Sequence, residues 1–68
     1  MKQVRDPRRK PVVGDLVASE DRKVKRRVEK IRAGVVTYYD GTELRECAVE
    51  SWQRWCRDRV ARVVKKAA

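Results

Sequence analysis

The chain lacks several residue types that common functions require. It has no histidine and no phenylalanine, only three glycines and two prolines, and no apolar run longer than three residues. Without histidine, the commonest general base and the commonest zinc ligand are both missing. No run of apolar residues is long enough for a signal peptide or a membrane span. We therefore expect a cytoplasmic protein that does not enter a membrane.

Catalytic and metal-binding motifs are missing as well. The three glycines are scattered, so they form no phosphate-binding loop. Cys47 and Cys56 are too few for a disulfide framework or a zinc site. We expect both to be free thiols in a reducing compartment, and we expect a protein that is not an enzyme and has neither metal nor cofactor.

What the chain does have is positive charge. Its 68 residues suit one small domain, and 19 Lys and Arg stand against 10 Asp and Glu, a net charge of +9. The cations gather in residues 2–10, 22–32 and 54–66, whereas residues 33–53 carry only Arg45 beside four acids. Such a charge attracts polyanions, and the sequence predicts binding to nucleic acid, RNA or DNA.

The predicted binding residues are taken from these clusters. Lys and Arg would contact phosphates, with Arg favoured because its guanidinium grips phosphate with two hydrogen bonds. An outward-facing tyrosine could stack on a base. The predicted contacts are Arg8, Arg9, Lys10, Arg22, Lys23, Lys25, Arg26, Arg27, Lys30, Arg54, Arg57 and Tyr39.

The first half of the chain gives mixed structural signals. Residues 1–10 show no apolar periodicity and are predicted to be a flexible basic arm. Residues 11–18 look like the entry to a first strand. Residues 19–33 suit a helix, with apolar residues at Val24, Val28 and Ile31, but they also suit a strand in which a bulge returns Ile31 to the core face.

The second half is clearer. Asp40-Gly41 lies between two runs of strand-forming residues and predicts a hairpin, with a bulge near Arg45-Glu46 because the apolar parity changes there. Ser51 is a candidate helix N-cap, and residues 51–66 carry apolar residues at helical spacing. Alternatively, this helix has one or two turns and 59–64 forms a last short strand.

Taken together, Gly14-Asp15, Gly34, Asp40-Gly41 and the tryptophan-bearing turn at Trp52 resemble the small SH3-like barrels of the KOW and Tudor-like type. Compact versions occur in bacteriophage and prophage proteins. The resemblance implies a mainly β fold over 11–68, with four to five antiparallel strands and a basic C-terminal helix from about 51. The alternative is an α+β fold in the order β-α-β-β-α. The resemblance also implies binding rather than catalysis.

A protein partner is the alternative to nucleic acid. The apolar stripe of the C-terminal helix could anchor such a partner, for example a host transcription or defence component that a phage regulator modulates. The same stripe could support a homodimer. The candidate interface residues are Trp52, Trp55, Val60 and Val63.

Overall fold

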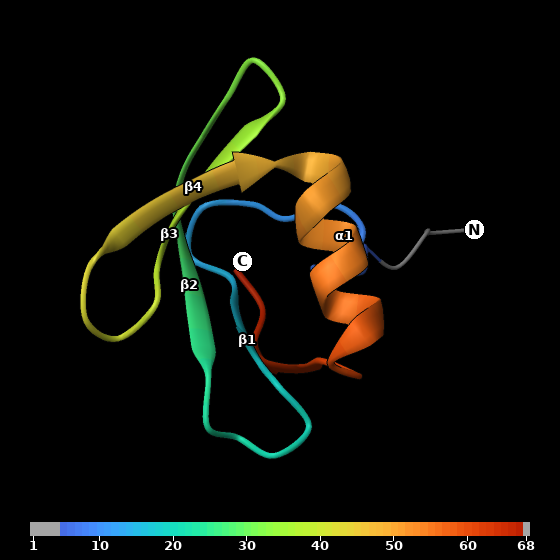
Figure 1. Cartoon of the computed structure of the whole chain (residues 1–68). Coiled ribbons are helices and arrows are strands. Elements are labelled where there is room, and N and C mark those ends of the chain that lie inside the picture. The colour runs from blue at the N-terminus through green and yellow to red at the C-terminus, as the bar shows by residue number, and fades with distance from the viewer. Residues whose placement is uncertain (1–4, 68) are drawn as a thin grey trace.

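The described part of the chain forms a single antiparallel sheet and one helix. The computed structural model describes residues 5–67. Its elements are β1 (Leu16–Ala18), β2 (Lys25–Arg32), β3 (Val35–Tyr39), β4 (Leu44–Ala48), α1 (Val49–Asp58) and β5 (Arg62–Lys65). The strand order is β4-β3-β2-β1-β5, and α1 stands against one side of the curled sheet (Figure 1). The predicted mainly β fold with a helix late in the chain is confirmed.

Strand β2 settles the ambiguity of residues 19–33. It pairs antiparallel with β1 on one side and β3 on the other, so the helical alternative, and with it the β-α-β-β-α order, is wrong. A register shift after Val28 leaves Glu29 as an extra residue, the predicted bulge. Because of it, Val28 pairs with Tyr38 and Ile31 with Val36, so both apolar residues of β2 face the same side.

The hairpin of β3 and β4 was predicted, but its details differ. Pairing runs without interruption from Tyr39 opposite Leu44, so the expected bulge near residues 45–46 does not form. The turn is closed by Asp40, whose carboxylate accepts hydrogen bonds from the backbone N–H groups of Thr42 and Glu43 at 2.9 and 3.0 Å. These bonds, with those from the Thr42 hydroxyl and Arg45, hold the pKa of Asp40 well below its usual value.

Helix α1 is shorter than the apolar periodicity suggested. It begins at Val49, two residues before the predicted cap Ser51, and its N-cap Ala48 makes no side-chain cap bond. It ends at Asp58, where the N–H of Ala61 donates to the carbonyl of Cys56 and that of Val60 to Arg57. These two bonds form a Schellman motif. The chain then returns as β5 beside β1, so the alternative of a shorter helix and a final strand is confirmed in kind. Its bounds differ, because the helix has 10 residues and the strand spans Arg62–Lys65 instead of 59–64.

The Schellman motif places a valine where helices usually have glycine. Val60 has φ 48°, a left-handed conformation that disfavours β-branched residues, and its side chain is 56% exposed. We expect Val60→Gly to raise the free energy of unfolding by about 1 kcal/mol and the melting temperature by about 5 °C, because strain is relieved and little burial is lost. Thermal and urea denaturation measure both quantities.

Val64→Gly is the matched control for that prediction. Val64 is 53% exposed and lies in β5, outside the positive-φ region. The same side-chain deletion there should destabilise the protein by about 0.5–1 kcal/mol. A Val60→Gly protein that is no more stable than wild type would contradict the assignment of strain to this position.

The core lies between the inner face of the sheet and α1. Its central side chains are Trp52, which is fully buried, and Val17, Val28 and Val36 from three neighbouring strands. Cys56 adds a second contact from α1. No helix in the described part of the chain is long and apolar enough to cross a membrane.

One buried carboxylate, Asp15, joins both ends of the described chain. Its Oδ2 accepts a hydrogen bond from Arg5 Nη1 at 2.6 Å and its Oδ1 one from Arg5 Nη2 at 2.9 Å. It also accepts from the N–H groups of Val12 and Ala67, both at 2.7 Å. Burial acts to raise the pKa of Asp15, but the hydrogen bonds from Arg5, Ala67 and Val12 outweigh it and lower the pKa. The carboxylate is therefore charged in the folded protein at neutral pH.

The basic segment before β1 is docked rather than free over residues 5–10. Trp52 Nε1 donates to the carbonyl of Pro7 at 3.1 Å, and Gln53 Nε2 donates to that of Arg9 at 2.9 Å. Arg8 Nη1 reaches the carbonyl of Ala61 at 3.3 Å. The predicted flexible arm is therefore corrected for residues 5–10, because α1 supplies partners for its backbone. Residues 1–4 lie outside the described part.

Candidate nucleic-acid interface

The outer face of the sheet collects cations from two of the three clusters. Residues directly opposite one another in antiparallel strands point to the same face. Across β1, Lys25 of β2 pairs with Ala18, which pairs with Arg62 of β5. One row further along, Arg27, Leu16 and Lys65 are aligned in the same way. The small or apolar residues of β1 thus have a cation on each side.

Two more cations of β2 continue this surface. Lys30 lies opposite Thr37 and Arg32 opposite Val35, on the face turned away from the buried Val36. All six side chains are exposed. The outer-face set, as we call it, comprises Lys25, Arg27, Lys30, Arg32, Arg62 and Lys65.

Tyr39 lies on the same face, beside Arg27. The two are opposite each other in β3 and β2, and the guanidinium carbon of Arg27 lies 5.5 Å from the centre of the Tyr39 ring. Arg27 also forms an ion pair with Glu29, Nε to Oε1, at 2.7 Å. The predicted outward tyrosine is thus Tyr39, since Tyr38 is in the core. A base stacking on Tyr39 would have to share the ring with Arg27.

Arg26 does not join these exposed cations. It points to the inner side, where its guanidinium carbon lies 4.0 Å from the centre of the Trp55 ring and 4.3 Å from that of Tyr38. Burial lowers its pKa, and its Nε is buried with no hydrogen-bond partner among the described residues. Arg26 therefore packs as part of the aromatic cluster, away from the outer-face set.

The other predicted cations take three positions. Arg22 and Lys23 lie in the turn between β1 and β2, where Arg22 lines a small hollow together with Lys25 and Arg62. Arg54 is exposed on α1. Arg57, on α1, lines a groove together with Arg8, Arg9 and Lys10 of the first basic cluster.

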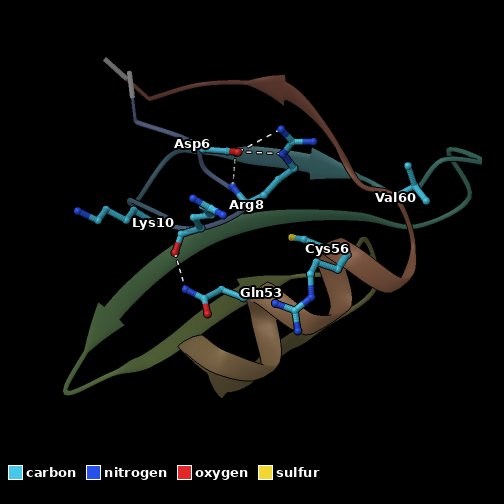
Figure 2. A pocket seen from close by; sticks show the side chains of 8 residues that line it. Asp6, Arg8, Lys10, Gln53, Cys56 and Val60 are labelled. Carbon is cyan, nitrogen blue, oxygen red and sulfur yellow. Dashed lines mark hydrogen bonds and ion pairs between the residues drawn. The ribbon is translucent and has the colours of Figure 1, made fainter. Parts of the chain in front are cut away.

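A groove separates that docked segment from α1. Its volume is about 790 Å³, and Lys10 and Val60 mark its two ends in Figure 2. Cations from both walls line it: Arg8, Arg9 and Lys10 from the docked segment, and Arg57 from α1. Asp6 is the one acid that the described residues contribute to the lining. The remaining lining residues are uncharged: Gln53, Cys56 and Val60.

Of these cations, Arg8 already has a partner. Its Nε and Nη2 bond the two carboxylate oxygens of Asp6 at 3.0 and 3.1 Å, as Figure 2 shows. This pair lowers the pKa of Asp6. The side chains of Arg9, Lys10 and Arg57 make no hydrogen bond or ion pair with any residue between 5 and 67. The groove therefore carries uncompensated positive charge on both walls.

The predicted protein-interface residues differ in how far their side chains are buried. Trp52 is fully buried, so that prediction is corrected: the side chain is in the core and offers no surface to a partner. Trp55 is half-buried under Arg26. Val60 and Val63 are exposed by 56% and 39%.

Cys47 and Cys56 are both free thiols, and burial raises the pKa of Cys56 to about 11.

Three cations of the outer-face set were missing from the predicted contacts: Arg32, Arg62 and Lys65. Each lies in a cluster that the sequence had marked, so the charge was visible. What the sequence could not supply was the pairing of β5 with β1, which decides where the side chains of Arg62 and Lys65 point.

The charge clusters thus meet in two places, on the outer face and in the groove. Comparison of the chain with protein-family models, with curated proteins and with solved structures gave no match.

Proposed function

We propose that this protein binds nucleic acid, chiefly through phosphate contacts made by the outer-face set. The observation that carries the proposal is the alignment of cations from β2 and β5 on both sides of β1. Among the described residues, Arg27 alone of the six forms an ion pair, and the other five cations form none. Phosphate groups would compensate their charge.

The expected mode of binding has little sequence specificity. Exposed lysines and arginines on a sheet contact backbone phosphates, which carry no base information. Tyr39 is the one aromatic side chain on this face among the described residues, and Arg27 covers part of it. The strand order and the helix between β4 and β5 also support the SH3-like resemblance, which implies binding rather than catalysis.

The test is the salt dependence of binding. We expect the affinity for a labelled oligonucleotide to fall steeply with salt, and the double variant Lys30→Gln/Arg32→Gln to lower the log–log slope by about 2 and the affinity roughly tenfold. Fluorescence anisotropy at several salt concentrations measures both. The reason is that each lost phosphate contact removes about one released counterion.

The double variant Arg59→Gln/Lys66→Gln is the control. Both residues are exposed and lie outside the outer-face set and the groove, and the loss of net charge is the same. We expect it to change the slope little. Equal losses in the two double variants would reduce the proposal to a general effect of net charge, and absence of binding at low salt would refute it.

The exposed valines favour a protein partner as the second candidate. Val63 and Val64 are 39% and 53% exposed in β5, an edge strand of the sheet. An exposed apolar edge strand is a site at which another chain can add a strand. A pull-down from nuclease-treated host lysate separates the two functions, because a partner bound through nucleic acid is lost and a partner bound through β5 is retained.

A further inference from the structure

The groove between the docked segment and α1 is a second basic surface, built differently from the outer face. The hydrogen bonds from Trp52 to Pro7, from Gln53 to Arg9 and from Arg8 to Ala61 hold its two walls together. All three bonds join residues more than 40 positions apart in the chain. The groove is therefore part of the folded structure, and the backbone that carries its cations is fixed on both walls.

The charge of the groove calls for an anion. Arg9 and Lys10 stand on one wall and Arg57 on the other, and none of the three side chains has an acidic partner among the described residues. Like charges held in one concave site repel each other, and a concave site with low-dielectric walls concentrates their field. An anionic ligand lying between the walls removes this repulsion.

The uncharged lining indicates which anion fits. No aromatic side chain from residues 5–67 lines the groove, so this part of the chain offers no surface there on which a base could stack. The thiol of Cys56 is neutral at physiological pH, because burial raises its pKa to about 11. Gln53 already donates to Arg9. The contacts left for a ligand are therefore those of Arg9, Lys10 and Arg57, which suit the phosphates of a sugar–phosphate backbone.

The groove lies between two walls that both carry cations, an arrangement that favours a single strand over a duplex. Proteins that hold single strands combine a positively charged groove that follows one backbone with aromatic side chains on which bases stack, and this groove has the first of these two features. A flexible single strand can place its backbone between the walls and leave its bases outside, whereas a duplex holds both backbones on a rigid helix. We infer that this groove binds the backbone of a single-stranded nucleic acid. The open outer face accepts either form, and this inference rests on the function proposed above.

The double variant Arg9→Gln/Arg57→Gln tests the inference. The probes are a labelled thymidine oligonucleotide, an abasic strand of the same length and a duplex of the same length. We expect the variant to bind the thymidine and abasic strands roughly tenfold more weakly than wild type, and the duplex less than about twofold more weakly. Both residues are exposed, and circular dichroism verifies that the variant keeps its fold.

Arg59→Gln/Lys66→Gln again controls for net charge. Equal losses for single strand and duplex, or equal losses in this control, would overturn the inference and leave the proposed function standing. A loss for the thymidine strand without a loss for the abasic strand would also overturn it, since the ligand would then be the base. If wild type binds none of the three probes at low salt, the proposed function fails as well, so the two failures are distinguishable.

Discussion

Replacing Asp15 with alanine is expected to lower the free energy of unfolding by about 3–5 kcal/mol, most of the stability of so small a domain. The carboxylate is completely buried and accepts hydrogen bonds from Arg5, Val12 and Ala67. Its removal leaves two backbone N–H groups without an acceptor, each costing about 1–3 kcal/mol. It also releases Arg5 and the end of the chain after β5.

Urea denaturation followed by tryptophan fluorescence measures this loss. Asp58→Ala is the control, because Asp58 is exposed at the last position of α1 and has no ion pair among the described residues. The same side-chain deletion there should change stability by no more than about 0.5 kcal/mol. If Asp15→Ala also falls within that range, the carboxylate does not hold the chain ends as described.

The stabilisation by Asp15 should also depend on pH. The hydrogen bonds lower the pKa of Asp15 in the folded protein, so its charged form is favoured by folding. Such a group stabilises the protein above its unfolded pKa of about 3.9, and this contribution is lost as the pH falls through the lower, folded value. The stability difference between wild type and Asp15→Asn should therefore shrink below about pH 4.

Local sequence patterns predicted the parts of the fold that depend on neighbouring residues. Alternation placed Val36 and Tyr38 on one face of β3, and both are buried. The bulge in β2 followed from the spacing of Val28 and Ile31. Even so, residues 19–33 suited a helix as well as a strand. Pairing with β1 and β3 decided between the two, and those partners lie outside the window that a local pattern covers.

The features that sequence missed depend on distant contacts or on an unusual residue. The end of α1 could not be predicted from the sequence, because Val60 has the positive φ that is normally associated with glycine. Asp15 lies where the sequence predicts the entry to a first strand, but one of its hydrogen bonds comes from Ala67, 52 residues away. Residues 5–10 are held by hydrogen bonds from α1 to their backbone, and such contacts leave no apolar periodicity from which they could be predicted.

The candidate site was predicted in composition but not in arrangement. Sequence identified the three basic clusters, and Lys25, Arg27 and Lys30 indeed share the outer face. It could not separate Arg26, one residue away, which the alternation of β2 turns toward Tyr38 and Trp55. A shift of one position reverses the side on which a strand residue points, so composition alone cannot define such a surface.

The two tryptophans, equivalent in the sequence pattern, should differ sharply when replaced. We expect Trp52→Ala to lower the free energy of unfolding by about 3–5 kcal/mol and to leave much of the protein unfolded. Trp52 is fully buried and packs edge-on against Tyr38, with ring centres 5.7 Å apart. Trp55→Ala is the comparison: its ring is half-buried, and its loss should cost about 1–2 kcal/mol. Urea denaturation followed by circular dichroism measures both.

Trp52→Phe separates packing from the hydrogen bond to Pro7. It keeps a buried ring but leaves the Pro7 carbonyl without its donor, at a cost of about 1–3 kcal/mol. The variant should stay folded. The backbone amides of Arg9 and Lys10, which donate to the backbone carbonyl of Asp6, should exchange their hydrogens with solvent faster. Unchanged exchange would mean that Gln53 and Arg8 hold the segment without Trp52. Faster exchange together with weaker single-strand binding and unchanged duplex binding would show that one core indole supports both the domain and its groove.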